Sequence, residues 1–337
     1  MSTLQGKRIL ITGASSGVGL AAVERFACAG ADLALVARGE AALTEAAAVA
    51  HEHGVEAHVF PADLADRDAT DRAVDAAAEA LGGLDMVVSN AAAVSFGHFL
   101  EVDPDDFDRA LAVTFTGAVN LIRAALPELR ASRGVIIATS SIMANMPLPA
   151  FSSYAAAKHA LRGFLNTLQV EEREQRTGVR VAMVSPGPVD TPIYDRATSA
   201  TGRQPAKLPD AYHPEALAEA LVKAAIAPRN DRIVGVESKL ASRLYRHARP
   251  AGELLLVAVD RWFRTGTEPA NHPGALWEAL VAARLSGGHP ARAAGDAITF
   301  AGNIASAAAR AVRTAPELLR PVPEEAHRMT NPTVTVG

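Results

Sequence analysis

Short apolar runs alternate with longer amphipathic stretches along residues 1–236 of this chain. The apolar runs have the length of buried strands, and the stretches between them have helical periodicity. Strands are expected at Ile9–Ile11, Leu33–Val36, Glu56–Pro61, Met86–Ser89, Val135–Thr139, Val179–Val184 and Arg232–Val236. Helices are expected at Gly19–Ala29, Glu40–His53, Asp68–Leu81, Pro104–Leu129, Ser153–Arg176 and Pro214–Ala227. This alternation predicts an α/β fold, a Rossmann-like doubly wound parallel sheet with helices on both faces.

The alternation stops near residue 236. Beyond it the pattern predicts a helical extension over residues 237–320 and a flexible tail over residues 321–337. The expected helices are Ser238–Arg249, Gly252–Arg264, Pro273–Leu285 and Ala293–Ala315. Basic residues and leucines are interleaved near its start, as in Lys239, Leu240 and Arg243. Two interpretations stay open: a helical cap or subunit contact, which we favour, and a peripheral contact with anionic membranes.

Composition narrows the class of protein further. Alanine makes up 71 of the 337 residues and aromatics only 5%, which suits helices and close packing. The net charge of −4 gives no reason to expect nucleic-acid binding. A single cysteine, Cys28, excludes an intramolecular disulfide, and we expect it to be buried as a small apolar residue. The histidines lack partners at ligand spacing, so no metal site is expected. No targeting or membrane segment is evident, which predicts a cytoplasmic protein.

A glycine-rich turn directly follows the first expected strand. Residues 12–19 read Thr-Gly-Ala-Ser-Ser-Gly-Val-Gly and lead into a helix. Glycines let the backbone approach a pyrophosphate closely, and the helix N-terminus offers unpaired N–H groups and a positive dipole end. This position predicts a dinucleotide-binding loop.

A second motif supplies acid–base chemistry. Tyr154 and Lys158 are four residues apart on an expected helix, so they share one face, and Ser141 precedes the tyrosine by thirteen residues. A neighbouring ammonium is expected to lower the pKa of the tyrosine, so that it exchanges a proton with a carbonyl or alcohol near neutral pH.

These motifs together resemble the short-chain dehydrogenase/reductase family, over about residues 5–236. The resemblance implies that Tyr154 is the general acid/base, that Lys158 also holds the nicotinamide ribose, and that Ser141 orients the substrate oxygen. It also implies the cofactor contacts Thr12, Gly13, Ser15, Ser16, Gly17, Val18, Gly19, Asp63, Leu64, Asn90, Ala91, Tyr154, Lys158, Pro186, Gly187, Val189 and Thr191.

Cofactor preference follows from the end of the second expected strand. Family members that prefer NAD usually carry an acidic residue there, whereas this chain has Ala37 followed by Arg38. A guanidinium suits the 2′-phosphate of NADP(H), so we predict NADP(H), with NAD(H) as the alternative.

One position departs from the family pattern. Thr114 stands where the family has an asparagine that helps to hold a proton-relay water. A threonine hydroxyl can still bind water, so Thr114 is carried over as a relay candidate.

The loops expected beyond the strand ends are apolar. Their candidate substrate contacts are Phe96, Met143, Met146 and Ile193. The sequence therefore predicts an NADP(H)-dependent oxidoreductase that interconverts a carbonyl and an alcohol on an apolar small molecule, in a homo-oligomer. The alternatives are an NAD-dependent dehydrogenase of the same family and a catalytically silent cofactor-binding regulatory or scaffold protein.

Overall fold

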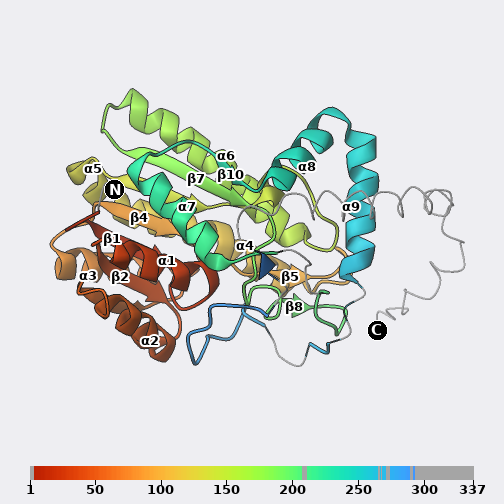
Figure 1. The fold of residues 1–337 in the computed structure, drawn as a ribbon, viewed down its shortest axis with the longest axis horizontal. Coiled ribbons are helices and arrows are strands. Elements are labelled where there is room, and N and C mark those ends of the chain that lie inside the picture. Colours follow the sequence, from red (N-terminus) through yellow and green to blue (C-terminus); the bar gives the residue numbers. More distant parts are fainter. Residues whose placement is uncertain are drawn as a thin grey trace, which may run out of the picture.

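The computed structural model describes residues 4–206, 211–264, 266, 268–270, 274–288 and 291–292. Its centre is a parallel seven-stranded sheet in the order β3-β2-β1-β4-β6-β7-β10 (Figure 1). The strands are β1 (Arg8–Thr12), β2 (Asp32–Ala37), β3 (Ala57–Pro61), β4 (Met86–Ser89), β6 (Val135–Thr139), β7 (Arg180–Pro186) and β10 (Arg232–Val234). Helices cover both faces, which is why these strands read as continuous apolar runs. The predicted fold class and all seven predicted strands are confirmed.

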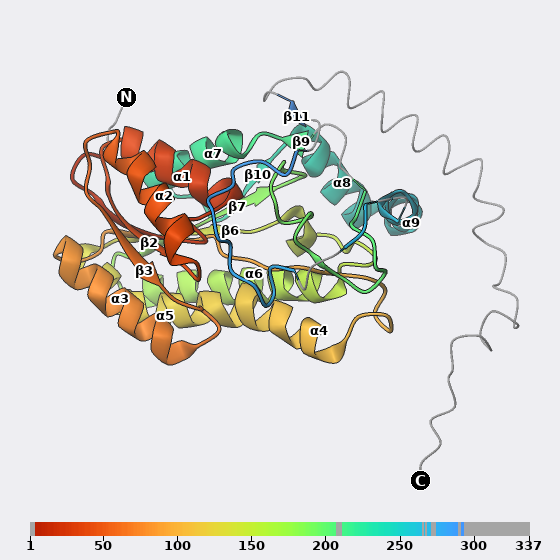
Figure 2. The ribbon, with the colours of Figure 1, turned by 90° about the horizontal axis from the view of Figure 1, so that it is seen from below.

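Two groups of helices form two apolar cores, one on each face of the sheet (Figure 2). One group contains α1 (Gly17–Cys28), α2 (Glu40–His51) and α7 (Pro214–Ile226). The other contains α3 (Arg67–Leu81), α5 (Gly117–Ser132) and α6 (Ser152–Glu174). Ile9 and Ile11 of β1 point into the first core, and Leu10 between them points into the second. The alternation along one strand thus ties both helical layers to it.

The predicted helix Pro104–Leu129 consists of three consecutive helical segments: α4 (Pro104–Leu111), a π-helical turn (Ala112–Thr116) and α5. The whole run, Pro104–Ser132, is long and apolar enough to cross a membrane by length and composition. Its apolar side already lies in the second core, where Leu121 and Leu129 are fully buried. We therefore assign it to the core.

The extension begins with two helices, α8 (Val236–His247) and α9 (Arg249–Phe263), as the sequence predicts. The inward side of α9 packs on the domain through Leu256 and Phe263. Leu240 and Leu244 of α8 are exposed on the outer side. The inward side of the extension is thus a helical cap on the domain. A membrane contact would involve only the exposed outer side, and it stays a prediction.

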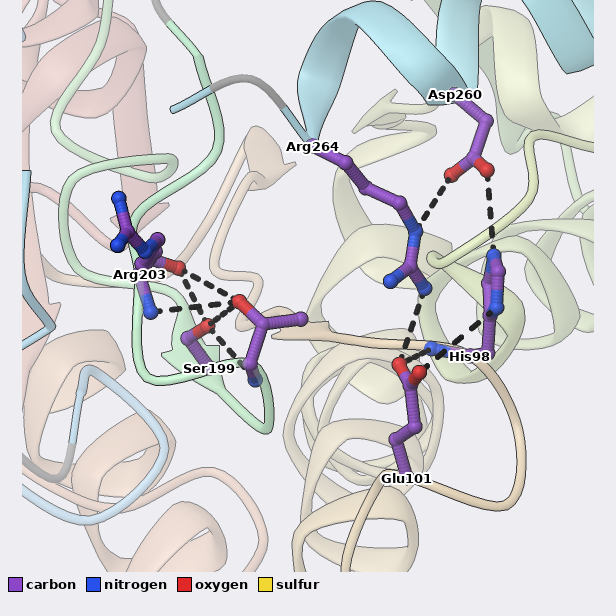
Figure 3. Close-up of polar contacts among 7 residues, drawn as sticks. His98, Glu101, Ser199, Arg203, Asp260 and Arg264 are labelled. Atoms are coloured by element: carbon purple, nitrogen blue, oxygen red, sulfur yellow. Dashed lines mark hydrogen bonds and ion pairs between the residues drawn. The ribbon is translucent and has the colours of Figure 1, made fainter. Parts of the chain in front are cut away.

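Polar contacts hold the end of α9 against the loop that follows β5 (Ser95–Phe96) (Figure 3). His98 Nε2 lies 3.2 Å from Asp260 Oδ2, and Arg264 donates to Glu101 Oε2 at 3.0 Å. Asp260 is almost fully buried, so its carboxylate has to be paired. The α9 helix is therefore fastened by charge as well as by apolar packing.

The next part of the extension differs from the prediction. A helix was expected over Pro273–Leu285, but residues 274–288 form turns and extended backbone, hereafter called the strap. In Figure 2 this blue segment crosses the carboxyl ends of the strands from the α4 side to β11 (Ala291–Arg292), which pairs with β9 (Ala211–Tyr212). Contacts with the domain, described below, override its helical periodicity.

The structure tests one further expectation, the burial of Cys28. Cys28, expected to be buried, is exposed at the end of α1, because Phe26 and Ala27 rather than Cys28 face the core. The predicted helix Ala293–Ala315 and the tail over residues 321–337 lie outside the described residues.

Candidate active site

A cavity of about 220 Å³ opens at the carboxyl ends of the strands, beside β1 and β4, where the sheet order reverses direction. Open α/β sheets bind ligands at this switch point. Most predicted cofactor contacts line it, namely Gly13, Ser15, Ser16, Gly17, Val18, Arg38, Asp63, Leu64, Asn90, Ala91, Tyr154, Lys158, Pro186, Gly187, Val189 and Thr191. Ser141 and Ile193 line it as well. Among the described residues, no cluster of His, Cys, Asp or Glu could hold a metal ion.

The glycine loop joins β1 to the N-terminus of α1, as the sequence predicts. Gly13 has φ +65°, a backbone conformation that side chains disfavour. A Cβ atom on Gly19 would lie 1.9 Å from the Gly13 carbonyl oxygen. Both positions therefore need glycine for the loop to fold back on its own helix. The result is a tight turn that presents a helix N-terminus to the cavity.

Thr12 and Asn90 fasten this loop to the end of β4. The Thr12 hydroxyl accepts the Asn90 N–H at 3.0 Å, and the Asn90 side-chain amide donates to the Thr12 carbonyl at 3.2 Å. Thr12 is fully buried, so its role here is to hold the loop and not to line the cavity. Asn90 and Ala91 form part of the cavity wall.

Ser141, Tyr154 and Lys158 meet at one end of the cavity. Ser141 follows β6 and caps a short 3-10 turn, Ile142–Ala144, where its hydroxyl accepts the Met143 N–H at 3.1 Å. Tyr154 and Lys158 lie on α6, with the Lys158 ammonium 5.4 Å from the centre of the Tyr154 ring. Lys158 Nζ also donates to the Thr139 carbonyl at 2.8 Å. The predicted triad is thus assembled.

The protonation of this triad differs from the expectation. The pKa of Tyr154 is raised well above its usual range, mainly by burial and also by the neighbouring Tyr194. A hydrogen bond with Ser141 acts in the opposite direction on the pKa of Tyr154. Burial lowers the pKa of Lys158 to about 7. The ammonium was expected to lower the pKa of the tyrosine, but in this structure burial raises it and Tyr154 keeps its proton.

Thr114 lies outside the cavity wall, within the π-helical turn. Its hydroxyl accepts the Ala93 N–H at 3.0 Å and donates to the Ala93 carbonyl at 3.1 Å. The only hydroxyl proton is therefore committed to the backbone. These contacts give Thr114 a positioning role for the chain after Asn90, and its relay role stays a prediction.

Arg38 lies where the sequence places it, after β2 at the edge of the cavity, but its guanidinium binds the strap. It donates to the carbonyls of Ala275, Leu276 and Glu278 at 2.5–2.9 Å. Arg196 also donates to the Glu278 carbonyl, at 3.2 Å. Arg196 was missed because nothing in its sequence neighbourhood marks it.

Asp63 also has a partner that the sequence did not indicate. Its carboxylate pairs with Arg109 of α4, and Arg109 donates in turn to the Leu276 carbonyl at 3.0 Å. The guanidinium of Arg109 stacks 5.5 Å from the ring centre of Trp277. This end of the cleft is therefore bordered by three arginines, Arg38, Arg109 and Arg196, and by the carboxylates of Asp63 and Glu278.

The chain after β7 forms the wall of the cavity that lies opposite the glycine loop. Val189 pairs with Tyr212 across an isolated bridge, and Thr191 packs against Gly17. A Cβ atom on Gly187 would lie 2.2 Å from the Ser238 hydroxyl, so glycine there allows α8 to approach. The predicted Pro186–Thr191 contacts thus lie opposite the glycine loop.

The substrate side is apolar, but only part of it matches the predicted residues. Ile193 lines the cavity, together with Tyr194, whose pKa burial raises to about 12. Phe96 and Met143 are buried in an apolar cluster behind the cavity, and Met146 packs against that cluster. Phe263 of α9 joins the same cluster, with its ring centre 5.4 Å from that of Phe151.

The cavity wall suits a nicotinamide dinucleotide. The Thr139 and Ser140 hydroxyls line the cavity, are buried and have no hydrogen-bond partner. Buried hydroxyls normally find partners, so these two are free for the hydroxyl groups of a ligand. The glycine loop and Arg38 offer the N–H groups that phosphates bind. Fold and site together define a dinucleotide-binding oxidoreductase with a Ser-Tyr-Lys site.

Comparison with known proteins gives the family. A family model described as short chain dehydrogenase matches residues 7–202. The chain belongs to the short-chain dehydrogenase family, as its motifs indicate, and it is an NAD(P)-dependent oxidoreductase of alcohol and carbonyl groups.

Two relatives show how far the similarity extends. An uncharacterized oxidoreductase, YxnA, of Bacillus subtilis is 34% identical over 72% of this chain and 69% of its own length. A hydroxysteroid 11-beta-dehydrogenase 1-like protein of Xenopus tropicalis is 39% identical over 56% of this chain. The match spans 66% of that Xenopus protein, just under two thirds.

A solved structure shows the same core. The alcohol dehydrogenase of Thermococcus sibiricus, complexed with 5-hydroxy-NADP, superimposes with a TM-score of 0.61 at 27% identity. It covers 68% of this chain and 95% of its own. About a third of this chain therefore has no counterpart in that structure.

Proposed function

We propose that this protein reduces the carbonyl group of an apolar small molecule to an alcohol, and catalyses the reverse reaction, with NADP(H) as its cofactor. The observation that carries this proposal is the triad: Ser141, Tyr154 and Lys158 line the same cavity, and the Lys158 amine lies 5.4 Å from the centre of the Tyr154 ring. No other group of described residues in the cavity brings a proton donor, a positioning hydroxyl and a buried lysine amine together.

Tyr154 is the proton donor in this proposal. Burial keeps the phenol protonated at neutral pH, so a proton is available for a carbonyl oxygen, although the raised pKa by itself makes the phenol a weaker acid. The Ser141 hydroxyl orients the same oxygen, and Lys158 would bind the nicotinamide ribose at the end of the cleft nearest the tyrosine. A bound nicotinamide would supply or accept the hydride.

The NADP(H) preference rests on charge at the adenosine end. Ala37 stands where NAD-preferring members carry an acidic residue, Arg38 follows it, and Arg196 approaches from the opposite wall. Guanidinium groups bind phosphate in a bidentate manner, so this pair favours a 2′-phosphate. The Thermococcus sibiricus structure carries an NADP derivative in the same fold.

The apolar substrate class rests on the cluster around Tyr154. Tyr154, Ile193 and Tyr194 are partly buried against Phe151 and Phe263. Apolar walls with a few placed polar groups are typical of small-molecule sites. The Xenopus relative, named for a hydroxysteroid dehydrogenase, fits the same class of substrate.

A panel of apolar ketones and aldehydes with NADPH and NADH tests the proposal. We expect NADPH oxidation with at least one apolar carbonyl, and a lower KM for NADPH than for NADH. A preference for NADH would contradict the cofactor assignment. Cofactor binding without turnover of any panel member would instead favour the catalytically silent alternative.

A further inference from the structure

The strap is fastened to the catalytic domain along its whole length. At its start, Leu276 is fully buried against Ala93 and Ala110, and the Trp277 indole donates to Asp106 at 2.6 Å. At its end, the Ser286 hydroxyl and the Gly287 N–H both donate to the Asp190 carboxylate, at 2.6 and 3.0 Å. A segment with anchors at both ends and a buried leucine is a packed element of this domain.

Between these anchors, strap carbonyls bind the donors expected to bind phosphates. The Gly17 N–H, at the start of α1, donates to the Arg284 carbonyl at 2.8 Å. Arg38 and Arg196, from opposite walls of the cleft, converge on the carbonyl of Glu278. A helix N-terminus and paired guanidiniums are anion sites, yet here neutral oxygens of the same chain occupy them.

The strap also limits the size of the cavity. Ala275, Glu278, Ala279 and Leu280 form part of its wall, and its volume is about 220 Å³. With the strap closed, its residues occupy part of the wall along which a bound dinucleotide would lie.

We propose that the strap is a built-in competitor of the dinucleotide, which has to lift it from the cleft in order to bind. The proposal rests on the proposed function, because it takes a nicotinamide dinucleotide as the ligand. Closed strap and bound cofactor then exclude each other, so the measured affinity is the intrinsic affinity reduced by the fraction of open molecules. Charge-assisted bonds to phosphate are stronger than bonds to a neutral carbonyl, which lets the cofactor displace the strap.

The experiment weakens the strap through a side chain that does not line the cavity. In the full chain, Leu276→Ala removes the buried anchor, and Val281→Ala is its control, because Val281 lies in the strap with 85% of its surface exposed. NADPH binding is followed by fluorescence titration and by stopped-flow association. We expect Leu276→Ala to lower the Kd for NADPH about threefold or more, mainly through faster association, and Val281→Ala to leave it unchanged.

A second pair of variants keeps the test informative if Leu276→Ala fails to fold. Asp106→Ala removes the acceptor of the Trp277 indole from outside the strap, and Asp105→Ala, an exposed neighbour, is its control. Deuterium exchange of peptides from residues 274–288 gives an independent readout. NADPH is expected to speed exchange of the strap in the unmodified protein.

The outcomes separate this inference from the proposed function. Weaker or unchanged NADPH binding in both Leu276→Ala and Asp106→Ala, or slower deuterium exchange of the strap with NADPH bound, would overturn the proposed competition. Such a result would indicate that the strap closes over the bound cofactor or is only a fixed wall of the cleft. If neither the unmodified protein nor the loosened variants bind NADPH or NADH, the proposed function itself fails, and the competitor with it.

Discussion

The Thr114 hydroxyl accepts a hydrogen bond from the Ala93 N–H and donates one to the Ala93 carbonyl, at 3.0 and 3.1 Å. One side chain thus satisfies both backbone groups of a buried residue three positions after Asn90. The π-helical turn over Ala112–Thr116 is what carries this hydroxyl, and such turns are frequent at functional sites.

Replacing Thr114 with valine keeps the shape and removes the hydroxyl. The N–H and carbonyl of Ala93 then lose their partner in a buried place, which costs about 1–3 kcal/mol of unfolding free energy. Chemical denaturation checks this value. Thr114→Ser, which keeps the hydroxyl, is expected to lose less, and equal losses for serine and valine would show that packing decides the effect.

Tyr154→Phe is expected to abolish proton donation while it keeps the ring. Turnover of a carbonyl substrate should fall by about 10²–10⁴-fold, the usual contribution of a positioned acid. The Kd for NADPH should stay within a factor of two or so, since the ring still packs on α6. Tyr194→Phe is the control, because Tyr194 also lines the cavity with a raised pKa. Equal loss in both variants would remove the special role of Tyr154.

The buried Lys158 predicts a pH dependence of stability. Its pKa is about 7 in the folded chain and near 10.5 when unfolded. Between these values the unfolded chain binds a proton that the folded chain does not, so the free energy of unfolding rises with pH. The rise is up to about 1 kcal/mol per pH unit.

Denaturation of the cofactor-free protein at pH 7, 8 and 9 measures this slope. Lys158→Met is expected to flatten it, whereas Lys223→Met, at an exposed position of α7, should leave it as it is. Parallel curves for the unmodified protein and Lys158→Met would contradict the lowered pKa of Lys158.

Docking of α9 on the domain rests largely on Phe263, which is buried between Phe151 and Tyr194. Phe263→Ala is expected to lower the free energy of unfolding by about 3–5 kcal/mol, as for other buried aromatics. Val257→Ala, on the exposed side of the same helix, should change it by less than about 0.5 kcal/mol. Similar values for both variants would mean that α9 does not pack as described.

Local patterns predicted the catalytic domain because each of its elements is determined by nearby residues. The apolar run Val135–Thr139 is buried on both sides, and the spacing of Tyr154 and Lys158 places them on one face of α6. The strap could not be predicted in this way. Leu276 and Leu280 have helical spacing, but Arg38, some 240 residues away, binds the carbonyls of Ala275, Leu276 and Glu278, which a continuous helix would need for its own hydrogen bonds.

The protonation of Tyr154 was mispredicted for a related reason. Residue spacing shows that a lysine is near, but it does not show how deeply both groups are buried. Burial depends on Tyr194 and on α9, which come from distant parts of the chain. Arg196 escaped prediction because only the folded strap brings it opposite Arg38.

The strap also has a consequence for the order of events on the ribosome. Chains fold from the N-terminus as they are made, at roughly 5–20 residues per second. The last strand of the sheet, β10, ends at residue 234, α8 begins at residue 236, and the strap ends at residue 288. These fifty or so residues take roughly 3–10 s to synthesise. During that time the nascent cleft has no strap, so a newly made enzyme can acquire its first cofactor without opposition.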